Sequence, residues 1–305
     1  MTRRKWQLLL MAGIVSAAAT ARAQNAIEST PAFASIYQRK VDAVAIGQLP
    51  QLFTGSASIA PNYGFPWMVS LEVKGTARQN GHFCGAVVID PAWVITAAHC
   101  VATAIRNGEG HTLAAADPDK LQVLTGTNIL SRGGSVRRIS RIVLHPEFGI
   151  AMQRVPNNDI ALLKISDAPN LTPLAVASAG QAETMLVDGE SVRIFGWGTA
   201  LFGPNNPVSN TLLYTFVDVV GRSKCNAKAA YDGGVADSMF CAGLGYSDAC
   251  QGDSGGPAVG YANGVPYLLG LVSWGVGCAN RSFPGVYTNV TKFNGWVHAI
   301  ISNRY

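Results

Sequence analysis

The sequence lacks three features that would assign it to a common class of protein. The apolar stretch from Trp6 to Ala19 is shorter than the about 20 residues that a membrane-spanning helix needs. No Cys-x-x-Cys pair is present, which argues against a zinc site. Charge is nearly balanced after the first 52 residues, because six of the 23 basic and two of the 18 acidic residues precede Phe53, which leaves 17 and 16. We therefore expect no metal or other cofactor, no membrane partner and no nucleic-acid partner.

The N-terminal end of the chain differs in composition from the rest. A basic start is followed by an apolar run, and Ala21 and Ala23 place small residues at the −3 and −1 positions before Gln24. This pattern is typical of a secretory signal peptide. We predict a signal peptide over 1–23, a propeptide or N-terminal extension over 24–52, and a secreted protein, either extracellular or periplasmic.

The cysteines are even in number and follow the predicted signal peptide. This arrangement indicates three disulfides formed in an oxidising compartment. Spacing alone leaves every pairing open. The six are Cys84, Cys100, Cys225, Cys241, Cys250 and Cys278.

Three short strings carry candidate chemistry. In DACQGDSGGP, Ser254 lies among glycines, which permit positive φ and let the N–H groups of Gly252 and Ser254 point together at a developing oxyanion. In VITAAHC, His99 follows an apolar strand-like run, and in NNDIALL, Asp159 precedes another. A serine, a base and an acid are the residue types that nucleophilic catalysis requires.

The string around Ser254 also fits Gly-x-Ser-x-Gly, the nucleophile elbow of α/β-hydrolases. That class needs an acid and then a histidine after the serine. One histidine, His298, follows Ser254, but no Asp or Glu does. The order of residues therefore excludes this class.

Taken together, in the order His, Asp, Ser, the strings resemble the signatures of the trypsin-like (chymotrypsin-fold) serine peptidases. The resemblance runs from about Phe53 to Tyr305. It implies an all-β fold of two six-stranded antiparallel β-barrels packed around a cleft, with a C-terminal α-helix. The peptidase domain would span 53–305, with the linker between barrels near 166–178. We expect a secreted serine endopeptidase that acts on protein or peptide substrates and is bound by protein protease inhibitors. The alternative is a catalytically silent homologue that acts as a binding module.

The resemblance implies a role for each residue of the three strings. Ser254 would attack the peptide bond, His99 would take its proton, and Asp159 would orient His99. The N–H groups of Gly252 and Ser254 would form the oxyanion hole. Activity should then rise with pH as His99 loses its proton, near the unperturbed pKa of about 6.5.

The substrate-binding residues follow from the same resemblance. Asp248 would lie at the base of the specificity pocket, and a sequestered carboxylate disfavours side chains without a cation, so Arg or Lys is expected there. Glycine at the walls leaves room for a long side chain, and Ser273 would hydrogen-bond the acid of the catalytic group. These residues are Asp248, Ser273, Trp274, Gly275 and Gly285.

The resemblance also pairs the cysteines and suggests an activation step. It implies the disulfides Cys84–Cys100, Cys225–Cys241 and Cys250–Cys278. Asp253 would form an ion pair with the α-amino group that cleavage of a zymogen frees. The best match to the mature terminus begins at Phe53 and follows Leu52, so self-cleavage after a basic residue is not expected.

Local patterns predict the remaining elements. Short β-rich runs separated by Gly, Pro and Asn indicate antiparallel strands. Residues 104–120 are predicted to be a surface-loop insertion. Apolar residues at helical spacing after Phe293 predict a helix that packs on the second barrel. We expect structural roles for the other histidines, which are His82, His111, His145 and His298.

Overall fold

The structure is a computed structural model of the chain. It describes residues 57–61, 64–76, 78–107, 110–150, 155–165, 171–199, 207–243, 247–280 and 282–302. The predicted signal peptide, the N-terminal extension and the expected terminus at Phe53 lie outside the described residues. None of the helices in these ranges is long and apolar enough to cross a membrane.

Six antiparallel strands close the first barrel in the order β11-β4-β3-β2-β7-β8. Val69, Val87 and Ile95 are fully buried and belong to one hydrophobic cluster with side chains from the other strands. Closure of the ring leaves no unpaired barrel edge. The strands are β2 (Met68–Val73), β3 (His82–Asp90), β4 (Trp93–Thr96), β7 (Leu121–Thr125), β8 (Ser135–Leu144) and β11 (Ala161–Ile165).

A second sheet has the order β1-β13-β12-β15-β16-β17-β14, and pairing of β13 with β14 closes six of its strands into another barrel. The short strand β1 (Ser58–Ile59) adds to the outside of β13. The predicted fold class is therefore confirmed. The barrel strands are β12 (Ser191–Gly196), β13 (Leu213–Val220), β14 (Met239–Ala242), β15 (Pro257–Ala262), β16 (Val265–Trp274) and β17 (Gly285–Asn289).

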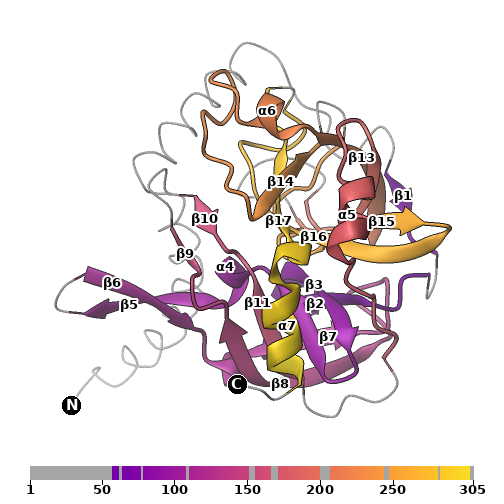
Figure 1. The fold of residues 1–305 in the computed structure, drawn as a ribbon. Coiled ribbons are helices and arrows are strands. Elements are labelled where there is room, and N and C mark those ends of the chain that lie inside the picture. The colour runs from indigo at the N-terminus through magenta and orange to yellow at the C-terminus, as the bar shows by residue number, and fades with distance from the viewer. Residues whose placement is uncertain are drawn as a thin grey trace, which may run out of the picture.

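The two barrels meet where the candidate site residues lie. In Figure 1 the first barrel lies below the second, and α4 (Ala98–Val101) is seen between them. The Gly85 N–H of the first barrel donates to the Ser254 carbonyl oxygen at 2.8 Å. Thr288 Oγ1 of the second donates to the Asp159 carbonyl oxygen at 2.9 Å. These bonds fix the two barrels against each other beside α4.

The prediction that residues 104–120 form a surface loop is wrong for most of this range. Strands β5 (Ala102–Asn107) and β6 (Gly110–Ala115) pair as an antiparallel hairpin, followed by one 3-10 turn, η1 (Pro118–Lys120). Figure 1 shows this hairpin extending away from the barrels. Gly110 begins β6 and pairs with Asn107 at the end of β5.

The C-terminal helix α7 (Asn294–Ile301) follows the 3-10 turn η2 (Val290–Phe293). Val297 and Ile300 are buried in the cluster that contains the first barrel's core, and the Trp296 ring lies 5.0 Å from the ring of His145, which follows β8. The helix is as predicted, and the cluster in which it is buried contains side chains of the second barrel, as expected, together with side chains of the first. Its apolar face reaches the first barrel and so helps to join the two.

Short elements complete the chain. Of the predicted linker, 166–170 lie outside the described residues, and 171–178 run without a strand to Ser178, which caps α5. The remaining elements are α3 (Arg78–Gly81), β9 (Gly149–Ile150), β10 (Pro156–Asn157), α5 (Ala179–Met185) and α6 (Arg222–Cys225).

Candidate active site

His99 and Asp159 are held together by two neighbouring strands of the first barrel. His99 is the second residue of α4, just after β4 ends at Thr96, and Asp159 lies just before β11. Since β4 and β11 pair with Thr96 opposite Ala161, both side chains leave the same end of the barrel. The His99 backbone N–H donates to Asp159 Oδ1 at 2.8 Å, and His99 Nδ1 lies 2.7 Å from Asp159 Oδ2.

The surroundings of Asp159 decide which nitrogen of His99 carries the proton. Asp159 is 1% exposed, and Ser273 Oγ donates to its Oδ2 at 2.5 Å. Burial by itself raises the pKa of this carboxyl, but the His99 charge and the hydrogen bonds from His99 and Ser273 bring the pKa below its usual value. An ionised carboxylate only accepts hydrogen bonds, so Nδ1 is protonated and Nε2 has a free lone pair.

The same pair makes His99 a stronger base than an isolated imidazole. Burial lowers the pKa of His99, but the charge and hydrogen bond of Asp159 outweigh it and raise the pKa above 6.5. This differs from the value near 6.5 expected from the sequence. The difference arises because Asp159 is buried with His99, which strengthens their attraction.

Ser254 comes from the second barrel, in the loop before β15. Its carbonyl is tied to Gly85, as described above, and the loop packs closely on the end of β4. A Cβ atom on Gly255 (φ +76°) would lie 2.2 Å from Thr96 Oγ1, so only glycine allows this approach. Among the described residues, the Ser254 hydroxyl forms no hydrogen bond. The structure therefore brings Ser254 to α4 without a direct hydrogen bond to His99.

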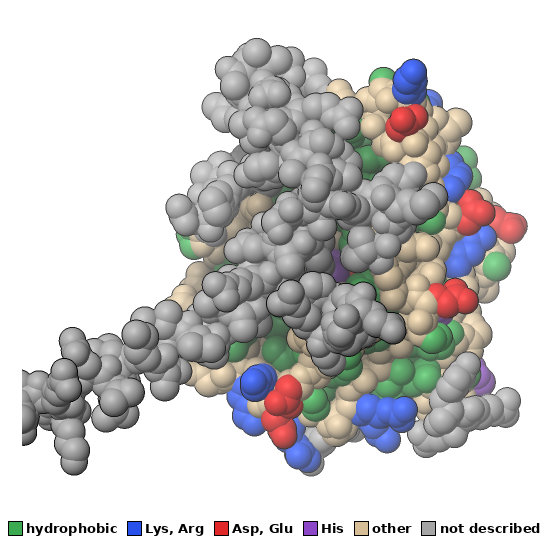
Figure 2. Space-filling view, turned by 90° about the vertical axis from the view of Figure 1, so that its left-hand side faces the viewer, with side chains coloured by type: hydrophobic (Ala, Val, Ile, Leu, Met, Phe, Trp, Pro, Cys, Tyr) green, Lys and Arg blue, Asp and Glu red, His purple; other side chains and the backbone are tan. Residues whose placement is uncertain are grey.

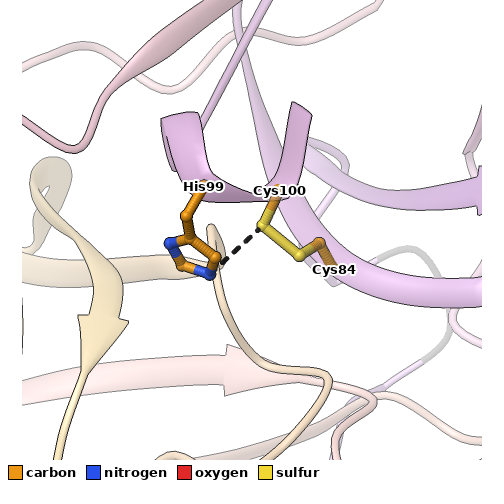
Figure 3. A group of neighbouring side chains, drawn as sticks. All are labelled: Cys84, His99 and Cys100. Carbon is orange, nitrogen blue, oxygen red and sulfur yellow. Dashed lines mark hydrogen bonds between the residues drawn. A yellow bond between two sulfur atoms is a disulfide. The ribbon is translucent and has the colours of Figure 1, made fainter. Parts of the chain in front are cut away.

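Figure 3 shows the Nε2 edge of the imidazole beside the Cys84–Cys100 disulfide. His99 Nε2 lies 3.7 Å from Sγ of Cys100, which forms a disulfide with Cys84. A disulfide sulfur has no proton to donate, so Nε2 remains able to accept one. Among the described residues, Cys84, His99 and Cys100 are the one group whose side chains lie close enough together to bind a metal ion. The two cysteine sulfurs are bonded to each other, so neither is a thiolate that could bind the ion.

Two backbone N–H groups beside Ser254 are available to a ligand. Within the part of the chain that the structure describes, the N–H groups of Gly252 and Ser254 have no acceptor. Gly252 adopts φ +95°, and a Cβ atom there would lie 3.1 Å from the Gly198 Cα. Two free donors on one short loop can stabilise an oxyanion.

Asp248 is buried beside two facing glycines. It is 3% exposed and accepts hydrogen bonds from the N–H groups of Ala249 at 2.8 Å and Ala279 at 3.0 Å. A Cβ atom on Gly285 would lie 2.6 Å from Asp248 Oδ1, and one on Gly275 would lie 3.7 Å from the Gly285 Cα. Glycine at 285 therefore leaves room beside the carboxylate, and Gly275 lies against Gly285.

Rigid neighbours frame this space. The Cys250–Cys278 disulfide links the two segments that bond Asp248. The ring of half-buried Trp274 lies 4.8 Å from that of Tyr231, edge to face, and the Tyr231 hydroxyl donates to the Pro284 carbonyl at 2.6 Å. Burial, with a further contribution from Asp248, raises the pKa of Tyr231, so its hydroxyl stays protonated.

Asp253, next to Ser254, is a buried carboxylate without a cation among the described residues. It is 1% exposed and accepts from the N–H groups of Gly198 at 2.7 Å and Cys250 at 2.8 Å. Burial raises its pKa to about 6, although these two hydrogen bonds act in the opposite direction. A Cβ atom on Gly196 would lie 1.9 Å from Asp253 Oδ1, so the loop accommodates this side chain only because glycine is there.

Sequence reasoning missed two residues that fix this geometry. Thr96 Oγ1 donates to the Gly85 carbonyl at 2.8 Å, and Thr288 Oγ1 holds the Asp159 backbone. Thr96 lies in the same string as His99, so its position could have been noticed. Thr288 lies 129 residues from Asp159 and gives no local signal.

The structure contains three disulfides, and they join the pairs that the resemblance implies. Cys84–Cys100 links β3 to α4, and Cys225–Cys241 links α6 to β14. With Cys250–Cys278, they account for every cysteine of the chain, and no free thiol remains.

Two closed six-stranded barrels that bring a buried carboxylate, an imidazole and a serine to their junction define the class of chymotrypsin-fold hydrolases. A family model described as Trypsin matches residues 55–297. A trypsin of Phaedon cochleariae is 34% identical over 241 residues, which are 77% of this chain and 83% of the relative. A tryptase of Mus musculus is 35% identical over 77% of this chain and 83% of the relative, and trypsin alpha of Drosophila erecta is 34% identical over 82% and 89%. The chain belongs to the trypsin family of serine endopeptidases.

Proposed function

We propose that this chain is a secreted endopeptidase that cleaves protein and peptide substrates after Arg, and less readily after Lys. The observation that carries the specificity is the Asp248 carboxylate, which is buried in front of two facing glycines. Two backbone hydrogen bonds hold it in place. A guanidinium that enters past Gly285 would bring a positive charge to this buried carboxylate.

In the proposed mechanism, Ser254 Oγ attacks the peptide carbonyl while His99 Nε2 takes its proton. The negatively charged oxygen of the tetrahedral intermediate accepts hydrogen bonds from the N–H groups of Gly252 and Ser254. His99 then donates the proton to the leaving amine, which leaves an acyl-enzyme that water hydrolyses by the same steps. Asp159 stabilises the imidazolium formed in each half of the reaction.

Specificity is tested with matched peptides that differ only in the residue before the cleaved bond. We expect kcat/KM to be about 10⁴-fold higher for Arg than for Phe or Leu, because an apolar side chain brings no positive charge to the buried carboxylate. Arg should also exceed Lys, since its planar fork can pair directly with the carboxylate and Ala249 offers no hydroxyl to help bind an ammonium.

The Asp248→Asn variant provides the control for this prediction. It removes the charge with little change in shape, so the preference for Arg should collapse while the fold is retained. Rapid cleavage after Phe by the unaltered enzyme would contradict the role of Asp248. Equal rates after Lys and Arg would contradict the Arg preference alone.

The pH dependence tests the role of His99. Only neutral imidazole accepts a proton, so kcat/KM should fall as the pH decreases through the pKa of His99. Because Asp159 raises that pKa, the midpoint should lie above 6.5. Replacement of Asp159 by asparagine should move the midpoint downward. A maximum of activity below pH 6 would contradict a histidine base; the measurement is kcat/KM from about pH 4 to 9.

Secretion and partners complete the proposal. The leader-like pattern over 1–23 and the three disulfides support an oxidising destination. Basic and acidic side chains lie side by side over the described part of the face in Figure 2, which favours protein partners, including protease inhibitors, over nucleic acid or a membrane surface. Recovery of the protein from the culture medium or periplasm, with a terminus at or beyond Gln24, would support secretion.

A further inference from the structure

A groove outside the proposed active site lies between the hairpin of β5 and β6 and the first barrel. Its volume is about 350 Å³, which falls in the range of ligand pockets, about 300–1,000 Å³. Leu113–Ala115 of β6 line one side, and Arg141–Leu144 of β8 line the other. His145, Pro146 and Phe148 complete the lining. The proposed mechanism and the proposed specificity use none of these residues.

The wall that β8 provides is a strand edge without a partner strand. β8 pairs with β7 from Ser135 to Arg138, and on its other edge it pairs with β11 as far as Leu144. Among the described residues, no strand pairs with β8 on the side of β7 beyond Arg138. Such an edge presents backbone N–H and C=O groups that can bind an extended peptide as an added strand. The groove therefore offers a strand position along β8, in line with β7.

The side chains at this end of β8 are incompletely covered on both faces of the strand. Ile139 is 1% exposed, as expected where one face of a barrel strand lies in the core. Ile142, Val143 and Leu144 are instead all half-buried, although successive residues of a strand point to opposite faces. Across the groove, Leu113 is 38% exposed. Native proteins usually cover or charge a strand edge, so an apolar edge indicates a surface that binds another chain.

The charges around the groove favour an acidic side chain at one end of it. Arg141 lies directly opposite Lys164 of β11, and neither forms an ion pair with a described residue. Like charges opposite each other on paired strands are destabilising, so an anion beside Arg141 would relieve their repulsion. At the other end, Glu147 lies between two lining residues and would repel an acid. The bound chain should therefore carry its acidic residue near Arg141 and apolar residues beside the rest of β8.

Both walls of the groove begin beside the proposed catalytic residues. β5 follows α4, which carries His99, and Figure 1 shows the hairpin starting there. On the other wall, the His145 N–H donates to the carbonyl of Ile160 at 3.1 Å, and Ile160 is next to Asp159. A protein substrate held at Ser254 can therefore reach the groove through a short length of its own chain.

We propose that this groove is a second binding site for the substrate, in which an extended segment of the substrate pairs with the free edge of β8 and places an acidic side chain beside Arg141. The inference rests on the proposed function, because the bound chain is a protein that the enzyme cleaves after Arg. A strand edge binds a peptide in extended form, and the groove opens beside the catalytic residues. Since Arg141 lies about 10 Å from Leu144 along β8, the acidic residue would be on the side of the segment away from the cleaved bond.

Peptides test the groove through KM. One arginine-containing peptide is the core, and a second also carries a segment of about five alternating valines and threonines that ends in aspartate. The segment is joined before or after the core through flexible linkers of about two to eight residues. The extended peptide should have a KM about 10- to 100-fold lower and a nearly unchanged kcat, because binding away from the reacting bond is equal in the ground state and the transition state. The better position shows which side of the substrate occupies the groove.

Two matched pairs of variants locate the binding site. Arg141 and Arg138 are both exposed on β8, but only Arg141 lines the groove, so Arg141→Ser should raise KM for the extended peptide about two- to fivefold and Arg138→Ser should not. Leu113→Asp places a negative charge on the apolar wall and should cancel most of the gain, whereas Thr112→Asp, on the other face of β6, should not. All four variants should cleave the core peptide normally, which shows that they fold.

A segment with proline at alternate positions separates strand pairing from general apolar attraction. Proline lacks the backbone N–H groups that pair with a strand edge, so this peptide should show no gain over the core. An equal gain from the proline peptide would overturn the inference. Equal effects of Arg138→Ser and Arg141→Ser, or an unchanged KM for every extended peptide, would overturn it as well.

Direct binding distinguishes failure of this inference from failure of the proposed function. The segment alone, labelled with a fluorophore, should bind to Ser254→Ala and lose affinity when Leu113→Asp is added, whatever the enzyme cleaves. No binding together with normal cleavage after Arg would overturn this inference alone, and binding without cleavage after Arg would overturn the proposed function. A dimer that Leu113→Asp dissociates would identify a second copy of the chain as the occupant. Binding only after removal of the residues before Phe53 would identify the N-terminal extension; either result would overturn the assignment to substrate.

Discussion

Replacement of Ser254 by alanine should lower kcat for peptide hydrolysis by about a millionfold. In the described loop between Gly252 and β15, Ser254 is the one residue that carries a hydroxyl. What remains should be the activity that the oxyanion hole and substrate binding supply without a nucleophile. The measurement is steady-state turnover of an Arg-containing peptide, together with titration of the active serine by an organophosphate probe.

The three proposed catalytic residues should behave as one unit. A variant that lacks both Ser254 and His99 should be about as slow as Ser254→Ala alone, because the base has no function without its nucleophile. Asp159→Asn should cost about ten-thousandfold, since an amide at this position favours the wrong tautomer of His99. The matched control is Ser140→Ala, an exposed serine on β8, which should keep full activity. Near-native hydrolysis by Ser254→Ala would contradict the whole proposal.

Most barrel strands are predictable from the sequence as short β-rich runs, whereas two give no such signal. β2, β7 and β8 were recognised because polar and apolar residues alternate or form β-branched runs. β14 (MFCA) contains no β-branched residue, whereas the equally short and buried β4 (WVIT) contains three. β15 begins with Pro257 and contains Gly260, both of which argue against a strand when read locally. Closure of the barrel overrides these local preferences.

The residues of the candidate site also include some that the sequence predicts and some that it does not. His99, Asp159 and Ser254 stand in local strings whose order carries information, so they could be named from the sequence. Thr288 reaches the Asp159 carbonyl because β17 of the second barrel lies beside the first barrel, and no local string encodes that contact. Sequence reasoning therefore identifies residues that act through a motif and misses residues that act across the junction of the barrels.

Asp253→Asn should abolish activity without unfolding the protein. A buried carboxylate that loses a cationic partner typically costs about 3–5 kcal/mol, which corresponds to a loss of roughly a hundredfold to a few thousandfold if the active loop conformation depends on it. The amide also fails to accept from both Gly198 and Cys250, so the loop that carries Gly252 loses one anchor. Asp237→Asn is the matched control, because Asp237 is an exposed carboxylate paired with Arg222. Retained activity in Asp253→Asn, measured as kcat/KM beside thermal unfolding, would contradict this prediction.

The need for a partner can be read from the pKa of Asp253, and the proposed partner is the α-amino group of a terminus close to Phe53. A carboxyl whose pKa rises on folding, here to about 6, stabilises the fold at pH below its unfolded value of about 3.9 and loses that contribution as the pH rises through 6. An ammonium group beside Asp253 lowers the pKa and removes this loss, so cleavage should increase stability at neutral pH as well as activity. We expect N-terminal sequencing of the active enzyme to give a terminus near Phe53, made by a protease that accepts Leu52 rather than by self-cleavage after Arg. A fully active enzyme that still begins at Gln24 would require a different partner for Asp253.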